Sequence, residues 1–123
     1  MPRILVIDDD EQILKMFRMA LERAGYEVET ASNGDDGLKC YRRNRADLVI
    51  TDIVMPEKEG LETIMDLKRE CPDVKIFALS GGGRISPNGY LTAASRLGAF
   101  RTFTKPVVLG DILAAVQEAL GES

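Results

Sequence analysis

Short apolar runs that alternate with stretches of helical periodicity are the feature of this sequence that most restricts its fold. A run such as Ile4–Ile7 is too short for a helix, and continuous apolar runs of this length are typical of strands buried on both faces of a sheet. The pattern along the chain predicts five strands, over residues 4–7, 26–31, 47–52, 74–80 and 101–104. The second of them is indicated by alternation, because Tyr26, Val28 and Thr30 alternate with Glu27 and Glu29.

A helical pattern follows each predicted strand. The first helix is expected to end at Gly25, because glycine is favoured just after a helix C-terminus. The next helices are expected to begin at Asn33-Gly34 and to cover residues 61–70 and 90–97, and a final helix follows Pro106. Their apolar faces are predicted to contain Ile13, Phe17, Leu21 and Ala24, then Leu38 and Tyr41, then Leu61, Ile64, Met65 and Lys68, and finally Leu109, Ile112, Leu113, Val116 and Leu120.

Strict alternation of strand and helix predicts right-handed parallel crossovers. The expected fold is therefore α/β, a doubly wound five-stranded parallel sheet with helices on both faces. A length of 123 residues suits one domain spanning residues 1–123.

Composition excludes several classes of function. A net charge of −4 argues against a nucleic-acid surface, which needs a basic stripe. No apolar run is long enough to span a membrane, and the N-terminus does not resemble a secretory signal. Cys40 and Cys71 match no metal or redox spacing and indicate reduced intracellular thiols, although sequence alone leaves a bridge between them open.

The chain contains no histidine. A Ser-His-Asp triad, a histidine-ligated zinc and a histidine general base are therefore excluded. Any phosphohistidine chemistry must be supplied by another molecule or by another part of a longer protein.

Reactive side chains stand at the predicted carboxyl ends of four strands, which is where a doubly wound sheet binds ligands. These are Asp8 and Asp9, Asp52, Ser80 and Lys105. Three carboxylates in one pocket repel each other unless a cation lies among them, and an all-oxygen site suits Mg²⁺. One carboxylate could then attack phosphorus, with the cation, the ammonium and the hydroxyl holding the phosphoryl oxygens.

Each of these residues also has a purely structural interpretation. The acids after the first strand could cap a helix, and this interpretation is expected to hold for Asp10. Asp52 could be a turn residue, Ser80 a loop residue and Lys105 a solvated surface charge. Together, these interpretations require four coincidences at four strand ends, which favours the functional one.

The ordered set of motifs resembles the receiver domains of two-component response regulators over essentially the whole chain. The matching residues are Asp8-Asp9 after Ile4–Ile7, Asp52-Ile53-Val54-Met55-Pro56 followed by Gly60, Leu79-Ser80, Gly98-Ala99, and Lys105-Pro106 before an amphipathic helix. The resemblance implies a flavodoxin-like fold with strand order 2-1-3-4-5.

By this resemblance, Asp52 is expected to be the phosphoacceptor. Asp9, Asp52 and the backbone carbonyl of Val54 would bind Mg²⁺ directly, while Asp8 would act mainly through a metal-bound water. Ser80 and Lys105 would bind the phosphoryl oxygens. The resemblance also implies a cis peptide bond between Lys105 and Pro106, a bond whose cost in X-Pro sequences is small.

Two positions depart from the family pattern. Thr102 occupies the place of the usual aromatic switch residue, and the neighbouring Phe103 should face the other side of the sheet because strand side chains alternate. The segment from Gly81 to Pro87 is rich in glycine, so ordering of this loop is a hypothesis for how Ser80 and Thr102 transmit the switch.

The resemblance also implies partners. A histidine kinase or phosphotransfer protein would donate the phosphoryl group, and a downstream protein or output domain would read the face built from the fourth helix, fifth strand and last helix. No nucleic-acid or membrane contact is expected of this domain, and its expected location is cytoplasmic. It would catalyse its own phosphorylation and slow dephosphorylation, acting as a switch rather than a turnover enzyme.

Two other classes of function are weighed against this one. A phosphorylation-independent scaffold would have no reason to keep all five site residues. A flavodoxin-like redox carrier or α/β phosphate enzyme would need an anion-binding loop after the first strand, where this chain has aspartates. A phosphatase of the Asp-x-Asp type would want a carboxylate at Val54.

Overall fold

The computed structural model describes residues 2–53, 60–81 and 94–121, and it contains one five-stranded parallel sheet. The strand order is β2-β1-β3-β4-β5, as the sequence predicts. The strands are β1 (Arg3–Ile7), β2 (Glu27–Ala31), β3 (Leu48–Asp52), β4 (Lys75–Ser80) and β5 (Arg101–Thr104).

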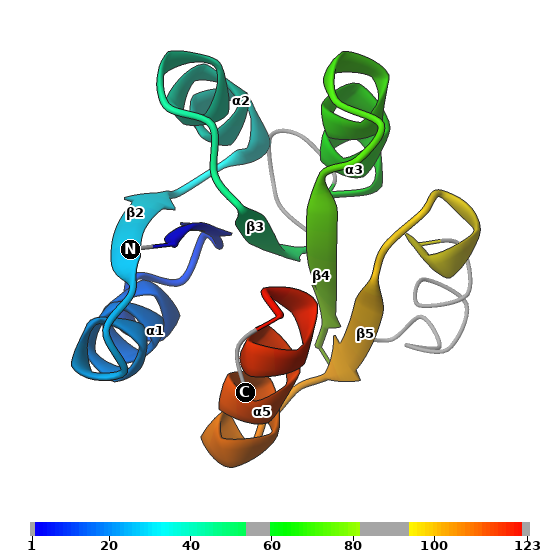
Figure 1. Ribbon diagram of the computed structural model, residues 1–123. Helices are drawn as coiled ribbons and strands as arrows, with labels where there is room; N and C mark the ends of the chain where they lie inside the picture. The colour runs from blue at the N-terminus through cyan, green and yellow to red at the C-terminus, as the bar shows by residue number, and fades with distance from the viewer. Residues whose placement is uncertain (1, 54–59, 82–93, 122–123) are drawn as a thin grey trace.

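Helices cover both faces of this sheet (Figure 1). They are α1 (Glu11–Arg23), α2 (Gly34–Arg43), α3 (Gly60–Glu70) and α5 (Leu109–Ala119). Residues 94–96 are helical and belong to the helix predicted over 90–97, of which residues 90–93 lie outside the described part of the chain. The predicted switch loop after Gly81 also lies outside it.

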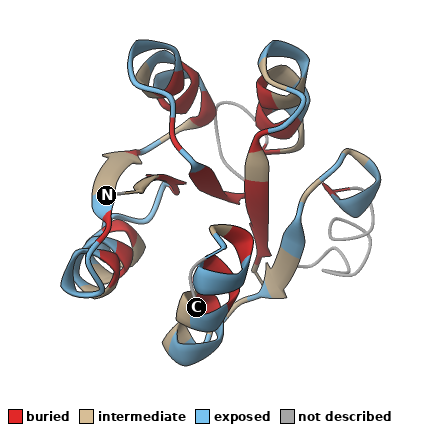
Figure 2. Cartoon of the chain, viewed as in Figure 1, coloured by how far each residue is buried: buried red, intermediate tan, exposed pale blue. Residues whose placement is uncertain are grey.

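Two hydrophobic clusters form the core, one on each face of the sheet. Leu5, Ile7 and Val49 pack under α2 and α3, whereas Ile4 and Val6 pack under α1 and α5. Alternation of side chains along a strand produces this division. The central strands β3 and β4 are accordingly buried along almost their whole length (Figure 2).

Local signals determine where the helices begin and end. The Asp10 side chain accepts a hydrogen bond from the Gln12 amide at 2.9 Å, so its predicted capping role is confirmed. Gly25 and Gly98 have φ values of 98° and 105°, the left-handed conformation that glycine adopts most easily after a helix.

Some predicted helix faces need correction. Ala24 is exposed, and α1 instead buries Leu14 together with Phe17 and Leu21. Met65 is 44% exposed, because the stripe of α3 that faces the sheet follows the 3.6-residue period through Gly60, Ile64 and Leu67. Leu61 and Lys68 are only partly buried at the edge of this stripe. Both cysteines are free.

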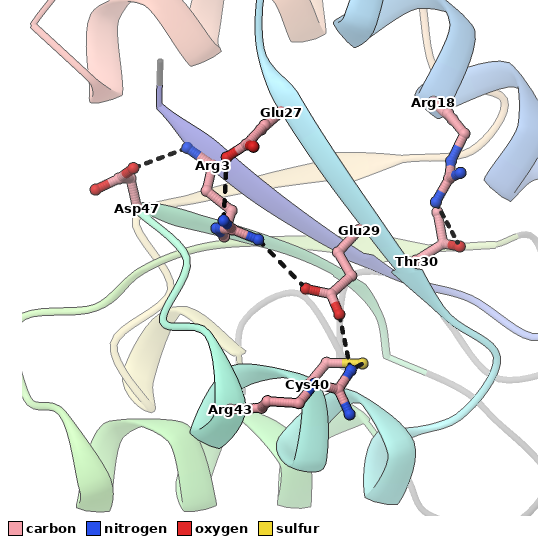
Figure 3. Close-up of polar contacts among 8 residues, drawn as sticks. All are labelled: Arg3, Arg18, Glu27, Glu29, Thr30, Cys40, Arg43 and Asp47. Atoms are coloured by element: carbon pink, nitrogen blue, oxygen red, sulfur yellow. Dashed lines mark hydrogen bonds and ion pairs between the residues drawn. The ribbon is translucent and has the colours of Figure 1, made fainter.

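A network of charged side chains joins β1, β2 and α2 at the amino-terminal end of the sheet (Figure 3). Arg3 pairs with Glu27 at 3.1 Å and with Glu29 at 3.7 Å, and Glu29 also pairs with Arg43 at 3.0 Å. Pairs that are exposed or partly exposed contribute about 0–1 kcal/mol each, so packing of the two clusters dominates stability. Among the described helices, none is both long and apolar enough to cross a membrane.

Candidate functional site

The carboxyl ends of the strands bring the predicted site residues together. Asp8 directly follows β1, Asp52 ends β3, Ser80 ends β4 and Lys105 directly follows β5. Parallel strands end at one edge of a sheet, which is why residues this distant in sequence share a site. Asp8 is anchored by its backbone amide, which donates to the Ala31 carbonyl at 3.1 Å.

Lys105 connects two of the carboxylates. Its Nζ lies 2.9 Å from Asp8 Oδ2 and 3.2 Å from Asp52 Oδ2. Burial lowers the pKa of Lys105, but the hydrogen bonds and charges of Asp8 and Asp52 outweigh burial and raise it above the ordinary value. The purely structural interpretation, in which Lys105 is a solvated surface charge, is wrong, because its ammonium is hydrogen-bonded to two buried carboxylates.

Asp8 shows the opposite balance. Burial raises the pKa of its carboxyl group, and the Asp10 amide and the Lys105 ammonium offset this only in part. The pKa values of both partners are raised because their burial differs. Burial dominates at Asp8, which is fully buried, whereas the neighbouring charges dominate at Lys105, whose side chain keeps 19% exposure to water. A carboxylate held in this way gains from any further positive charge nearby.

Asp8, Asp9 and Asp52 form a group that could hold a metal ion. One carboxylate oxygen from each lies within 4.8 Å of the others, with Asp8 and Asp52 buried and Asp9 exposed. Carboxylate oxygens with open access to water on one side suit a hard divalent cation. The donor set therefore fits the predicted Mg²⁺.

Ser80 has an unsatisfied hydroxyl group. Its residue is 1% exposed, and its Oγ has no hydrogen-bond partner among the described residues. Leaving a buried hydroxyl unpaired costs about 1–3 kcal/mol. The Ser80 carbonyl accepts from the Lys105 amide at 2.8 Å, so the two residues are neighbours at the ends of β4 and β5. The Ser80 hydroxyl, having no partner among the described residues, can donate to a ligand oxygen.

The remaining predicted residues have different outcomes. The Lys105–Pro106 peptide bond is cis, as expected. Thr102 is half-buried on β5 opposite Ala78, while Phe103 packs against Phe77 in the cluster under α1 and α5, which confirms that Phe103 faces away from Thr102. The Val54 carbonyl lies outside the described residues, so its predicted role stays a prediction.

Sequence reasoning missed two features next to the site. The sequence marks Gly60 only as the glycine that completes the motif after Asp52, but in the structure it lies directly against the backbone of Asp52 and Ile53. An apolar pocket of about 450 Å³ also opens beside Lys105, with Ile13, Met16 and Val107 on its walls. Spacing reveals neither, because both depend on how closely α3 and α1 approach the sheet.

Comparison with protein families gives one match over nearly the whole chain. The family described as "Response regulator receiver domain" matches residues 4–117. Among curated proteins, the transcriptional regulatory protein GlrR of Escherichia coli is 34% identical over 98% of this chain, and the DNA-binding transcriptional regulator NtrC of Azospirillum brasilense is 36% identical over 98%. The matches cover 26% and 24% of those proteins, so the chain spans about a quarter of their length.

Solved structures agree in fold. A response regulator receiver domain protein from Clostridium thermocellum superposes with a TM-score of 0.91 at 34% identity, covering 98% of this chain and 95% of that one. The Vibrio cholerae chemotaxis protein CheY4 superposes with a TM-score of 0.85 at 27% identity, covering 97% and 98%.

Proposed function

Because the chain belongs to the receiver domains of two-component response regulators, we propose that it accepts a phosphoryl group on Asp52 from a phosphohistidine of a partner protein. The observation that carries this proposal is the position of the Asp52 carboxylate. It lies at the carboxyl end of the central strand β3, 3.2 Å from the Lys105 ammonium and within the acidic group that could hold a cation.

The proposed reaction is a simple displacement. A carboxylate oxygen of Asp52 forms a bond to phosphorus, the P–N bond to the donor's imidazole breaks, and the imidazole leaves with the bonding electron pair. The product is an acyl phosphate, and no oxidant or further reactant is required. Hydrolysis later returns the free carboxylate and inorganic phosphate.

The residues around Asp52 would act mainly by electrostatics and positioning. Lys105 would bind a phosphoryl oxygen, and the unsatisfied Ser80 hydroxyl would donate a hydrogen bond to another. Asp8, Asp9 and Asp52 would hold Mg²⁺, whose contribution is positive charge next to the transferred group. These roles are supported by the contact of the Lys105 ammonium with the Asp52 carboxylate and by the Ser80 hydroxyl, unpaired among the described residues, at the end of the neighbouring strand β4.

The donor must come from outside this sequence, because the chain has no histidine. We propose a histidine kinase or a phosphotransfer protein, acting in the cytoplasm. The apolar pocket beside Lys105 supports docking of a protein, since it offers a contact surface next to the reacting atoms. Signalling to a downstream protein or output domain would use the face that includes β5 and α5.

Mass spectrometry after incubation with acetyl phosphate and Mg²⁺ tests this function. We expect one phosphoryl group per chain, lost on treatment with hydroxylamine because the product is a mixed anhydride. The adduct should be absent in Asp52→Asn, which keeps the size of the side chain but not the nucleophilic carboxylate. An adduct on a hydroxyl such as Ser80, or none with any phosphodonor, would leave a phosphorylation-independent scaffold as the better interpretation.

A further inference from the structure

The first residue of α3 lies directly on the backbone that carries Asp52. A Cβ built on Gly60 would be 2.5 Å from the Ile53 Cα and 2.9 Å from the Asp52 carbonyl carbon, and it would overlap the Asp52 carbonyl oxygen. Real Cβ atoms essentially never approach closer than 3.0 Å to such atoms. No side chain therefore fits at Gly60 while α3 and β3 keep their present separation.

The peptide between Asp52 and Ile53 is held at both of its polar atoms, and the Ile53 carbonyl that follows it is held as well. The Thr51 hydroxyl donates to the Asp52 carbonyl at 3.0 Å. The Ile53 amide donates to the Leu79 carbonyl of β4 at 2.9 Å, and the Ile53 carbonyl accepts from the Gly60 amide at 2.6 Å. Since these contacts leave little freedom, the direction of the Asp52 side chain follows from the position of this peptide.

Among the other glycines that the structure describes, none would place a Cβ against the backbone in this way. A Cβ on Gly37 in α2 would meet only side-chain atoms of Ile7, which can rotate. A Cβ on Gly110 in α5 would meet nothing within 4 Å. At Gly60 the obstacle is backbone, so a larger residue must move either α3 or the end of β3.

We propose that Gly60 and the Thr51 hydroxyl are positioning residues for Asp52, an inference that rests on the proposed function of Asp52 as phosphoacceptor. Gly60 lets α3 lie against the Asp52–Ile53 peptide, and Thr51 fixes the Asp52 carbonyl from within β3. Together they hold the Asp52 carboxylate at its distance from Lys105. Neither residue contacts the transferred group itself.

The test is the phosphorylation rate of Gly60→Ala with acetyl phosphate and Mg²⁺, expressed per folded molecule. Because misplacement of a reacting group by about 1 Å can cost about 100-fold, we expect a rate at least about tenfold lower than wild type. Gly37→Ala and Gly110→Ala are the matched controls and should keep the wild-type rate. The ¹⁵N resonance of the Lys105 amino group should shift in Gly60→Ala only.

The outcomes separate this inference from the proposed function. A wild-type protein that is never phosphorylated contradicts the function itself. A phosphorylated wild type together with a Gly60→Ala variant that is less stable but equally fast per folded molecule overturns the positioning role alone, since a merely structural glycine affects only the folded fraction.

Thr51→Val provides a second, independent test if Gly60→Ala does not fold even in trimethylamine N-oxide. Valine keeps the shape of this fully buried residue and removes the hydroxyl that binds the Asp52 carbonyl. We expect a lower phosphorylation rate per folded molecule and a shifted Lys105 resonance. A wild-type rate in Thr51→Val would overturn the proposal that this peptide must be held for Asp52 to react.

Discussion

Lys105 and Asp8, 97 residues apart in the chain, form an ion pair of 2.9 Å in which the carboxylate is fully buried. The pair connects the end of β1 with the segment after β5. The same ammonium also contacts Asp52 at the end of β3, which lies between these strands in the sheet. In the unphosphorylated protein the lysine thus neutralises part of the acidic group. Any ligand that binds Lys105 must compete with this carboxylate.

Lys105→Ala should weaken both stability and phosphorylation. Loss of the ammonium leaves the Asp8 carboxylate buried without its partner, at a cost of about 3 kcal/mol in the free energy of unfolding. Lys105→Arg should not restore the response, because a planar guanidinium does not replace a compact ammonium. Urea unfolding and phosphorylation by acetyl phosphate measure the two effects, with the exposed Lys39→Ala as control. A full phosphorylation response in either Lys105 variant would show that this lysine has no part in the reaction.

Asp9 and Asp10 are neighbours with opposite predicted effects. Asp9→Ala should reduce Mg²⁺ affinity and phosphorylation together while the fold survives, and relief of carboxylate repulsion could raise stability. Asp10→Ala should retain Mg²⁺ binding, but its free energy of unfolding should fall by about 1 kcal/mol because the Asp10 side chain caps α1. Calorimetric titration with Mg²⁺ and thermal unfolding distinguish the two. A wild-type phosphorylation rate in Asp9→Ala would refute the metal assignment.

Ser80→Ala should stabilise the unphosphorylated protein or leave its stability unchanged. The hydroxyl is buried without a hydrogen-bond partner among the described residues, so its removal relieves up to about 1–3 kcal/mol. In the phosphorylated state the variant should lack the proposed hydrogen bond from Ser80 to a phosphoryl oxygen. The lifetime of its acyl phosphate, or its signalling, should therefore differ from that of the wild type. Chemical denaturation with and without phosphodonor compares the two states, and the exposed Ser95→Ala serves as control. Clear destabilisation of unphosphorylated Ser80→Ala would show that the hydroxyl already has a structural role.

Tyr41 should make the fold sensitive to alkali. Burial, followed by its hydrogen bond with Cys71, raises the pKa of Tyr41 well above its ordinary value. The folded state then retains a proton that the unfolded state releases above about pH 10, so the stability that Tyr41 contributes is present below pH 10 and declines as the pH rises further. Tyr41→Phe should show a smaller decline in unfolding free energy between pH 9 and pH 11, measured in urea. Equal declines in the two proteins would contradict this.

The sequence predicts the architecture well because strand and helix signals agree along the chain. Parallel strands ending at one edge are sufficient to bring Asp8, Asp52, Ser80 and Lys105 together, and the structure confirms this arrangement. The expected direction of Phe103 also follows from alternation alone. These inferences need only the period of a strand and the order of elements.

Details that depend on the approach of one element to another were not predictable. The position of Met65 on the exposed side of α3 follows from the helix rotation that places Gly60 on the sheet. The apolar spacing of α3 is compatible with two neighbouring faces, and the close approach of Gly60 to the backbone of Ile53, which spacing does not reveal, accompanies the one observed. Similarly, sequence placed Lys105 near the acids but did not show that Asp8 would be its nearest partner.

The distribution of site residues along the chain means that the proposed site is complete only when nearly the whole domain has folded. A polypeptide emerging from the ribosome exposes Asp8 early, but it has no Lys105 until nearly all of the domain has been synthesised. Truncated or partly assembled chains therefore lack the full constellation around Asp52. On the proposed function, we expect only chains that have folded with Lys105 in place to take up phosphate at the full rate.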